Sequence, residues 1–406
     1  LDIYKEGVYG ALANEYIQES DIDDALRGPF RVMIHLGLLD PPEMVPYAKI
    51  GITDTIEPWF TEKHRKTALE ATQKTIVLLK NANELLPLHV EKIKSIAVIG
   101  PLADSVLLDW YSGTPPYKVT PLQGIRNKAG NHAKIYFAVD NRFNKAVEIA
   151  RESDVAIVVV GNHPTGNDDW EKCPVPSDGK EAVDRKTISL EQEELIKRIY
   201  EVNQHTIVVL ISSFPFAINW TKENIPAIVH MTHCSQETGN ALADVLFGDY
   251  NPAGRLVQTW PKSERQLFPM MDYDITHGRT YMYFKEEPLF EFGYGLSYSS
   301  FEYSDFKLSS NRIPSDGKIK VSVKIKNTGD IAGDEVVQLY VKHINSKFQR
   351  PIIELKGFDR VNVKPGEVKT VEIPINADDL AYWDDIKHAF VVSKIKIMII
   401  RGSSWK

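Results

Sequence analysis

Apolar residues recur at helical spacing over the first part of the chain. Tyr9 and Leu12 share one face of a predicted helix, and a second run of this kind follows Ser20, which we expect to cap it. Gly37 and the Pro41-Pro42 pair end the pattern, and a proline-containing linker follows. Two such helices cannot bury their apolar faces alone. Residues 1–60 are therefore predicted to be the end of a domain whose bulk lies elsewhere.

Short apolar runs alternate with amphipathic segments between residues 61 and 265. Thr61 is placed to cap a helix over 62–80. The strands expected after it span residues 95–100, 133–139, 154–161, 206–212 and 226–232, and the helices span 121–129, 142–151, 190–201 and 237–247. Strands separated by helices in this way imply an α/β domain with a mostly parallel sheet, helices on both faces and right-handed crossovers.

The period changes in the last third of the chain. Residues 266–300 are rich in glycine beside aromatic residues and are expected to form a connector packed over another domain. From residue 301 apolar and polar residues alternate, most clearly over 319–326, 335–342 and 368–375, and Phe390 to Ile400 is expected to close the domain. Several short strands with turns between them make residues 301–406 an all-β domain, a β-sandwich.

Composition removes several classes of function. The 406 residues are 43% hydrophobic and 25% charged with a net charge of −7, so no basic face for nucleic acid is indicated. No apolar run reaches the ~20 residues of a membrane span. Zinc-binding patterns are absent, and no glycine-rich phosphate loop follows a strand, so we expect neither a metal nor a nucleotide cofactor. The two cysteines, Cys173 and Cys234, fall in predicted loops, and whether they pair is left open.

One long irregular segment lies inside the α/β region. The strand expected at 154–161 is followed by residues 162–180, which keep neither a helical nor a strand period. Such loops are usually functional or disordered, and this one begins at the carboxyl end of a strand, where open α/β sheets bind their ligands. Glu181 follows, three residues before Asp184-Arg185, and its carboxyl group could deliver a proton to a leaving group. The residue types alone favour a plainer interpretation, a solvated loop with a cluster of charges.

A series of stretches, taken in order, resembles glycoside hydrolase family 3. They include Glu-Ala-Val-Asp-Arg at 181–185 and Phe-Gly-Tyr-Gly-Leu-Ser-Tyr at 292–298, and the others lie at residues 75–88, 97–104, 111–115, 236–256, 327–341 and 354–358. Members of that family have an amino-terminal (β/α)8 barrel, an α/β sandwich domain and, commonly, a fibronectin type III-like domain. The resemblance implies that residues 1–60 correspond to the closing helices of a barrel and a linker. It likewise implies an α/β sandwich domain over 61–265 and a fibronectin type III-like β-sandwich over 301–406.

The resemblance also implies a reaction. Similar members are exo-acting β-xylosidases or β-glucosidases that remove terminal non-reducing sugars from plant-type oligosaccharides by retaining double displacement. Their nucleophile is an aspartate of the barrel, which this chain lacks, and their acid/base is the glutamate that here is Glu181. The two carboxyl groups of a retaining enzyme lie about 5–5.5 Å apart. This chain is thus expected to supply half of a catalytic pair.

The resemblance suggests further substrate-binding residues. Trp110 and, less strongly, Tyr111 sit where relatives place an aromatic wall for the sugar. Arg279 and Tyr281 belong to a Gly-Arg-Thr-Tyr stretch similar to that of β-xylosidase-like members, and His163 follows a strand and could reach the cleft. The plainer interpretation of each is packing within a loop.

Asp184 and Arg185 are expected to form an ion pair that orients the segment carrying Glu181. Lys180 would lower the pKa of that glutamate, which is the wrong direction for a general acid unless burial outweighs it.

A competing hypothesis from a different class is a non-catalytic carbohydrate-binding or assembly subunit. The intact Glu-Ala-Val-Asp-Arg segment argues against it. The partners expected for an enzyme are a glycoside or oligosaccharide substrate and a barrel domain, from the same precursor or a second chain, with a homodimer as another arrangement. Relatives are often secreted or periplasmic.

Overall fold

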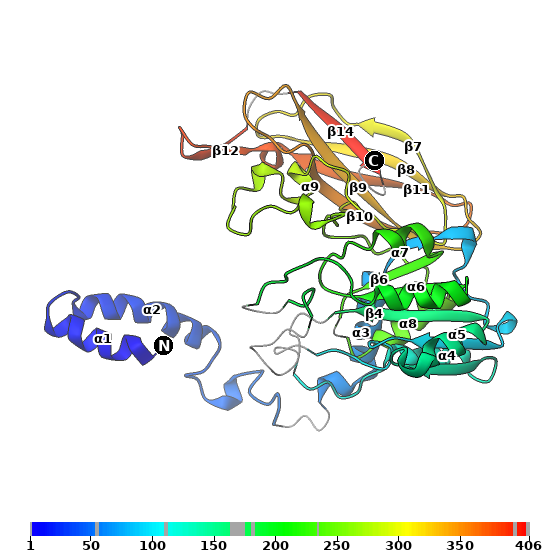
Figure 1. Cartoon of the computed structure of the whole chain (residues 1–406). Helices are drawn as coiled ribbons and strands as arrows, with labels where there is room; N and C mark the ends of the chain where they lie inside the picture. Colours follow the sequence, from blue (N-terminus) through cyan, green and yellow to red (C-terminus); the bar gives the residue numbers. More distant parts are fainter. Residues whose placement is uncertain are drawn as a thin grey trace. The chain divides into compact units, whose positions relative to one another are not determined.

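The computed structural model describes residues 2–52, 57–108, 113–162, 175–179, 183–233, 235–392 and 396–402. These residues fall into two units, 1–62 and 63–406, which are described separately (Figure 1).

The first unit is helical. It contains α1 (Asp2–Ala13), α2 (Glu19–His35) and two 3₁₀ turns, η1 (Pro42–Met44) and η2 (Pro58–Phe60). The prediction that Ser20 caps the second helix is wrong, because α2 begins one residue earlier and the backbone N–H of Gln18 donates to Asp21 Oδ2 at 2.9 Å. No residue of α2 is buried.

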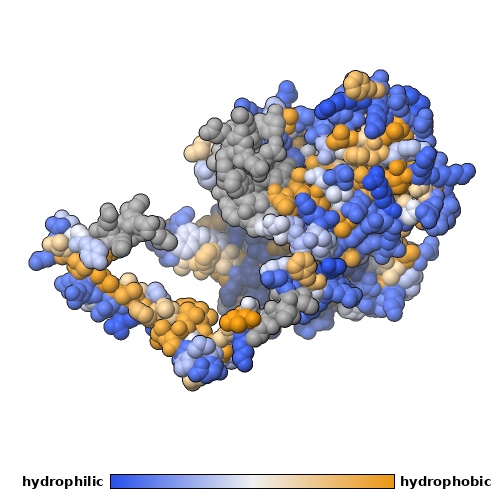
Figure 2. Space-filling model, turned by 90° about the horizontal axis from the view of Figure 1, so that it is seen from below, coloured by the Kyte–Doolittle hydropathy of each residue, from blue (hydrophilic) through white to orange (hydrophobic). Residues whose placement is uncertain are grey.

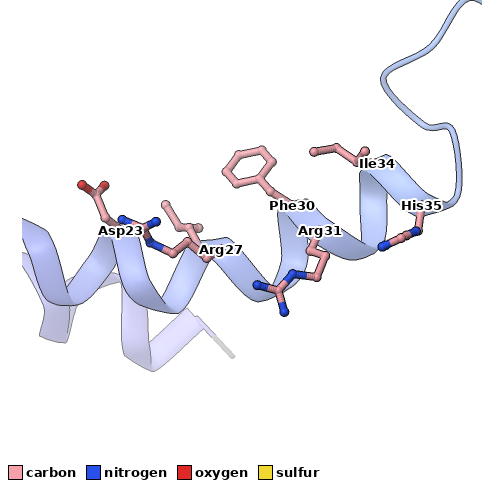
Figure 3. A pocket seen from close by; sticks show the side chains of 7 residues that line it. Asp23, Arg27, Phe30, Arg31, Ile34 and His35 are labelled. Carbon is pink, nitrogen blue, oxygen red and sulfur yellow. The ribbon is translucent and has the colours of Figure 1, made fainter.

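One side of α2 is apolar and uncovered. Phe30 and Ile34 project from the same side of the helix (Figure 3), and Leu26 lies one turn before Phe30. Leu26, Phe30 and Ile34 are all exposed. Figure 2 shows the apolar atoms of this unit as an orange stripe along the helical segment. The helix therefore has an apolar face of the kind that is usually buried, and no described residue covers it.

The second unit begins with a six-stranded sheet in the order β1-β6-β5-β4-β2-β3. Strand β1 is antiparallel to β6, and the remaining neighbours are parallel. The strands are β1 (Val77–Asn81), β2 (Ser95–Ile99), β3 (Lys134–Ala138), β4 (Val155–Gly161), β5 (Thr206–Ile211) and β6 (Ala227–Met231). The helices are α3 (Glu62–Thr75), α4 (Pro121–Ala129), α5 (Lys145–Arg151), α6 (Glu193–Val202), α7 (Asn219–Asn224) and α8 (Thr238–Phe247), with 3₁₀ turns η3 (Ala82–Glu84), η4 (Val90–Lys92) and η5 (Arg142–Asn144).

The helix predicted over residues 62–80 is wrong in its last part, which forms strand β1. The helix α3 ends at Thr75, and the residues after it pair with β6 in the sheet. Ile76, Val77 and Leu78 are at most 3% exposed, so three consecutive side chains are buried. A helix buries only one stripe of its surface, whereas an edge strand covered on both faces buries consecutive residues, and this favours the strand here.

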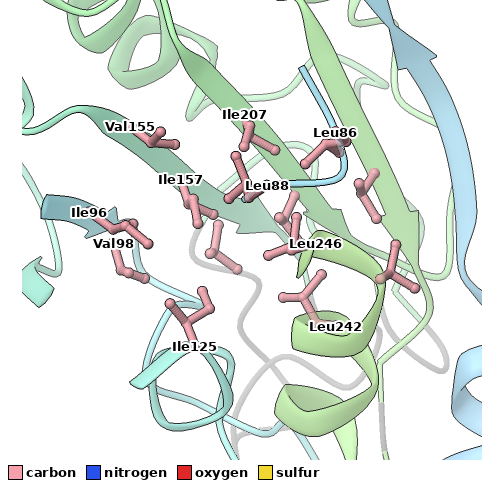
Figure 4. Close-up of a cluster of buried hydrophobic side chains, with 14 of the residues drawn as sticks. Leu86, Leu88, Ile96, Val98, Ile125, Val155, Ile157, Ile207, Leu242 and Leu246 are labelled. Atoms are coloured by element: carbon pink, nitrogen blue, oxygen red, sulfur yellow. The ribbon is translucent and has the colours of Figure 1, made fainter. Parts of the chain in front are cut away.

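The sheet is covered by helices on both faces because alternate residues of its central strands point in opposite directions. Ile157 of β4 packs in a cluster with Leu242 and Leu246 of α8 and with residues of α4 (Figure 4). The next residue, Val158, packs on the other face with Ile196 of α6 and with α5. All seven residues of β4 are buried. The predicted mostly parallel, doubly covered sheet is confirmed.

From here on we use the name connector for all of residues 249–300, which lie between α8 and β7 and contain little regular structure. It holds η6 (Glu264–Gln266), η7 (Ile275–His277) and the short helix α9 (Thr280–Tyr283). Trp260 is buried against His230 of β6 and Phe290, with ring centroids 5.1 and 5.8 Å away. Burial lowers the pKa of His230 to about 4, so this histidine is neutral in the core.

The last part of the chain is an antiparallel β-sandwich. One sheet has the order β10-β9-β14, the second β11-β8-β7, and a hairpin is formed by β12 and β13. The strands are β7 (Phe301–Leu308), β8 (Lys318–Asn327), β9 (Gly333–Ile344), β10 (Glu354–Val363), β11 (Val368–Asn376), β12 (Tyr382–Asp384), β13 (Ala389–Val391) and β14 (Lys396–Gly402), and η8 spans Ala377–Leu380. The predicted fold class is confirmed. Phe390 to Ile400 is not one strand, since it is divided between β13 and β14.

The α/β domain and the β-sandwich are joined by buried polar contacts. Arg255 Nη2 lies 3.1 Å from Glu335 Oε2, and both side chains are almost fully buried. Gln338 Nε2 of β9 donates to the carbonyl of Gly293 at 3.0 Å. Within the sandwich, Tyr303 of β7 donates its hydroxyl hydrogen to Glu335 Oε1 at 2.5 Å. Burial raises the pKa of Glu335 and lowers that of Arg255, so each charge depends on the other for its stability.

Candidate active site

The described residues include only part of the site predicted from the sequence. Asp184, Arg185, Arg279 and Tyr281 are described. The residues that lie outside the described part are Trp110, Tyr111, His163, Cys173, Lys180, Glu181 and Cys234. The site is therefore built from the segments that flank Glu181.

Glycine permits a close approach of backbones at the carboxyl edge of the parallel sheet. Gly161, the last residue of β4, has φ of +133°, and a Cβ there would lie 1.9 Å from the carbonyl oxygen of Ile211 at the end of β5. The next residue, Asn162, is buried and donates its backbone N–H to the same carbonyl at 3.1 Å. The chain after β4 thus leaves the sheet directly beside the chain after β5.

Arg185 connects the two segments that flank Glu181 with the segment after β5. Its Nε donates to the carbonyl of Ser177 at 2.8 Å, and its Nη1 donates to the carbonyl of Pro215 at 2.9 Å. The guanidinium carbon lies 4.9 and 4.6 Å from the ring centroids of Phe214 and Phe216. Burial lowers the pKa of Arg185 to about 10, which leaves it charged at neutral pH. Charged hydrogen bonds and ring stacking together fix this side chain.

The predicted ion pair between Asp184 and Arg185 is not formed. Asp184 is exposed, whereas the carboxyl groups that act on the Arg185 charge belong to Glu191, Asp178 and Glu264. Burial, and then the nearby charge of Glu191, raises the pKa of Asp178. The prediction rested on two opposite charges that are adjacent in the sequence. The Arg185 side chain instead donates to the backbone carbonyls of Ser177 and Pro215, which are distant from it along the chain.

Further hydrogen bonds hold the flanking segments together. Lys186 donates its backbone N–H to the carbonyl of Pro176 at 2.8 Å, and Ser177 donates both its N–H and its hydroxyl to the carboxylate of Glu191. The backbone N–H of Ile188 donates to Glu264 Oε1 at 3.1 Å. Residues 175–179 and 183–188 are therefore joined by hydrogen bonds into one unit, here called the layer. Glu264 attaches it to the connector.

Gly179 closes this layer. A Cβ at Gly179 would lie 2.6 Å from Cγ of Arg185, so only glycine fits beside the arginine side chain. Residues 180–182, which include Glu181, connect Gly179 to Val183 along the chain.

A second polar cluster lies beside the segment that follows Trp110 and Tyr111. Tyr117 donates its hydroxyl hydrogen to Glu237 Oε1, and Asn240 Nδ2 donates to Glu237 Oε2 at 2.6 Å. Glu237 is buried, and burial raises the pKa of Tyr117 to about 12. Backbone hydrogen bonds from Val119 and Gly239 run between the same two segments. The segment after residue 112 is thus fixed to the start of α8.

Arg279 and Tyr281 lie in the connector. Arg279 Nη2 donates to the carbonyl of Pro269 at 2.6 Å. The ring of Tyr281 stacks on Phe292 at 4.1 Å, and its hydroxyl oxygen accepts from the N–H of Leu355 at 3.0 Å. These contacts bind the connector to itself and to β10. Both residues also line an open pocket of about 730 Å³ that Pro215 borders.

Sequence reasoning missed the residues that hold Arg185. Phe214, Pro215 and Phe216 follow directly after β5, so their position at a carboxyl strand end was an available signal. Glu191 and Glu264 gave no comparable signal, because nothing in their neighbours marks them as hydrogen-bond partners of the segments that flank Glu181.

In the part of the chain that the structure describes, no group of three His, Cys, Asp or Glu side chains is arranged to hold a metal ion. A search of the same residues finds no helix with the length and apolar character of a membrane span.

Comparison with known proteins decides the family. The family description "Glycosyl hydrolase family 3 C-terminal domain" matches residues 76–298, more than half of the chain, and "Fibronectin type III-like domain" matches residues 335–405. The chain belongs to glycoside hydrolase family 3.

Family 3 relatives with curated names agree with this assignment. A β-xylosidase of Formosa agariphila is 38% identical over 88% of this chain and 50% of its own length. A periplasmic β-glucosidase of Salmonella typhimurium is 34% identical over 94% of this chain and 54% of its own length. The chain thus spans about half the length of these relatives.

Solved structures give the same result for the fold. A β-glucosidase of Chaetomella raphigera superimposes with a TM-score of 0.83 and 26% identity, covering 98% of this chain and 61% of the other. A β-glucosidase of Listeria innocua, solved with isofagomine, gives 0.83 and 25% over 98% of this chain and 56% of the other. The predicted resemblance to family 3 is confirmed.

Proposed function

We propose that this chain is the part of an exo-acting retaining β-glycosidase that carries the acid/base, with Glu181 in that role. The nucleophile would be an aspartate of a barrel domain outside this chain. Support comes from membership of family 3 and from relatives named β-xylosidase and β-glucosidase. The substrates proposed are terminal β-xylosides or β-glucosides of plant-type oligosaccharides.

The observation that carries the proposal is the anchoring of both segments that flank Glu181. Arg185 binds the carbonyl of Ser177 on one side of the glutamate and that of Pro215 after β5. Among the described residues, Asp178 before the glutamate and Arg185 after it each form a hydrogen bond close to it along the chain. A general acid acts efficiently only when it is held within hydrogen-bonding reach of the leaving oxygen. The hydrogen bonds on both sides of this position support the role proposed for it.

The reaction would proceed in two displacements. The barrel aspartate attacks the anomeric carbon and forms a glycosyl ester, while Glu181 gives its proton to the departing glycosidic oxygen. Glu181, now a carboxylate, then removes a proton from water, which attacks the anomeric carbon and releases the aspartate. Arg185 is proposed as a positioning residue. Its charge is balanced by the carboxyl groups of Glu191, Asp178 and Glu264, which limits its lowering of the pKa of a further carboxyl group.

The sugar contacts proposed are Trp110, with Tyr111 and His163 as further candidates. The hydrogen bond from Tyr117 to the buried Glu237 supports this part of the proposal, since it fixes the segment just after Trp110 and Tyr111. A sugar face stacks well on an aromatic ring. For Arg279 and Tyr281 the contacts support a role in holding the connector rather than in touching the sugar.

The decisive experiment requires the barrel domain. A chimera that joins the amino-terminal half of the Formosa agariphila β-xylosidase to this chain should hydrolyse aryl β-xylosides or aryl β-glucosides. Glu181→Gln should lower kcat/KM about 10²–10⁴-fold on natural disaccharides, and much less on substrates with activated leaving groups, which need no acid. Glu194→Gln, an equal change on an exposed face of α6, is the matched control.

Two results would change the conclusion. Full activity of Glu181→Gln on disaccharides refutes its role as acid/base. A folded chimera that hydrolyses none of these substrates, while the chain alone binds oligosaccharides, favours the non-catalytic binding subunit instead.

A further inference from the structure

The connector carries an uncovered apolar surface. Six side chains of this surface, here called the connector strip, are exposed: Val257, Leu267, Met270, Met271, Tyr273 and Ile275. Met271 is 78% exposed and Tyr273 is 79% exposed. Large apolar side chains occur singly on most protein surfaces, but a cluster of six along one segment is typical of an interaction site.

The strip is held in place by its own hydrogen bonds. Arg279 fixes the carbonyl of Pro269, and Asp274 Oδ1 accepts from the N–H of Thr276 at 2.9 Å. His277 Nδ1 lies 2.8 Å from Asp272 Oδ2. These hydrogen bonds order the part of the connector that carries the strip. A surface ordered before binding loses little conformational entropy when a partner covers it.

The strip also borders the pocket of about 730 Å³, whose wall includes Leu267, Phe268, Met270, Ile275 and Phe292. Most of this wall is apolar, and one side chain from a partner could fill part of it. Exposed apolar side chains next to an apolar pocket are typical of the centres of protein interfaces.

The position of the strip indicates which partner covers it. Glu264, three residues before Leu267, binds the N–H of Ile188 and the hydroxyl of Thr187. Those residues follow Arg185 in the anchored layer that flanks Glu181. A nucleophile that works with Glu181 must come within about 5–5.5 Å of it. The domain that brings this nucleophile must then extend over the neighbouring surface, and the connector is attached there.

We propose that the connector strip is the docking surface for the amino-terminal domain that supplies the nucleophile. The inference rests on the proposed function. The lengths of the curated relatives agree with it, because this chain spans about half of each and the other half of such a relative is of comparable size. An interface of that kind buries about 800 Å² or more on each side, and the strip would form one apolar part of it.

Methionine oxidation tests the proposal without reference to activity. Met270 and Met271 are 60% and 78% exposed, and Met398 of β14, 50% exposed, is an internal control outside the strip. In the chain alone, hydrogen peroxide should oxidise all three. In the chimera with the Formosa agariphila amino-terminal half, Met270 and Met271 should be oxidised at least about 10-fold more slowly than in the chain alone, while Met398 keeps its rate. Peptide mass spectrometry measures the three rates.

A variant provides a second measurement that does not depend on the chimera folding. Met271→Arg should leave the thermal unfolding of the chain unchanged, because the side chain is exposed, and should lower the amount of separately expressed amino-terminal half that co-purifies with it. Val368→Arg, on an exposed residue at the start of β11, should leave co-purification unchanged.

Three outcomes would overturn the proposal. The first is equal oxidation of Met270, Met271 and Met398 in the chimera. The second is protection of the two strip methionines in the chain alone through self-association, which would make a second copy the occupant. The third is undiminished co-purification of Met271→Arg. A chimera in which Met270 and Met271 are protected but which hydrolyses none of the glycosides would instead refute the proposed function.

Discussion

Replacing Arg185 tests whether the layer around Glu181 is held by one side chain. Arg185→Ala removes two charged hydrogen bonds, to Ser177 at 2.8 Å and to Pro215 at 2.9 Å, and two ring contacts. Such hydrogen bonds contribute about 1.5–3 kcal/mol each, and exposed cation–π contacts about 0.5–1 kcal/mol. Because the guanidinium is only partly buried, we take the lower ends. The free energy of unfolding should fall by about 4 kcal/mol.

Urea unfolding of the chain, followed by tryptophan fluorescence, measures this change. Arg185→Lys keeps the charge, but one ammonium group cannot serve both carbonyls or stack as a plane, so it should lose about half as much. Arg198→Ala is the matched control, since Arg198 makes an exposed pair with Glu194 at 3.2 Å that is worth about 0.3–0.5 kcal/mol.

Kinetics separates positioning from general stability. In the chimera, Arg185→Lys should lower kcat on substrates with poor leaving groups by about 10²-fold while KM changes little, because a displaced acid fails at proton transfer. The reasoning is refuted if Arg185→Ala stays within about 0.5 kcal/mol of the unmodified chain, the range of a neutral surface change. A change in KM alone would also contradict it.

Three other predictions follow from the described contacts. Gly161→Ala should lose about 2–4 kcal/mol of stability in urea unfolding, since its Cβ would meet a carbonyl at 1.9 Å, whereas Gly366→Ala, with positive φ but open space, should lose about 1–2 kcal/mol; equal losses would contradict the steric argument. Glu335→Gln leaves a buried arginine unpaired and should cost about 3–5 kcal/mol, and a cost below 1 kcal/mol would mean that the charge is not needed. His277, hydrogen-bonded to Asp272, has a raised pKa, so its contribution to stability is complete below the unfolded pKa and is lost as pH rises through the folded value; NMR titration should show the pKa fall in Asp272→Asn, and an unchanged value would exclude the pair as the cause.

The parallel sheet could be predicted because its strands are fully buried runs separated by helices of regular length. Strand β1 could not, because Ile76 to Leu79 continues the apolar stripe of α3 and periodicity cannot distinguish a short buried strand from the end of a helix. Pairing within the sheet determines that these residues form a strand. Pairing with β6, over 140 residues later in the chain, supplies hydrogen bonds that a longer helix would not gain.

The candidate site divides in the same way. The loop before Glu181 could be singled out by its position after a strand, since the carboxyl edge of a sheet is a general place for ligands, whereas the role expected of Glu181 came from the resemblance to family 3. The partners of Arg185 could not, because two of them are backbone carbonyls, of Ser177 and Pro215, and carbonyls carry no sequence signature. Adjacent charges such as Asp184 and Arg185 are easily taken for a pair, although neighbours along an extended chain point in opposite directions.

The buried pair of Arg255 and Glu335 has a consequence for how this architecture can be divided. The arginine belongs to the connector and the glutamate to β9, so a truncation between the two domains would separate two buried side chains, each of which is the counter-ion of the other. The boundary seen in the sequence period is therefore a poor place to cut an expression fragment. It also constrains recombination during evolution, because a β-sandwich exchanged from another protein must bring its own carboxylate at this position or arrive together with a changed connector.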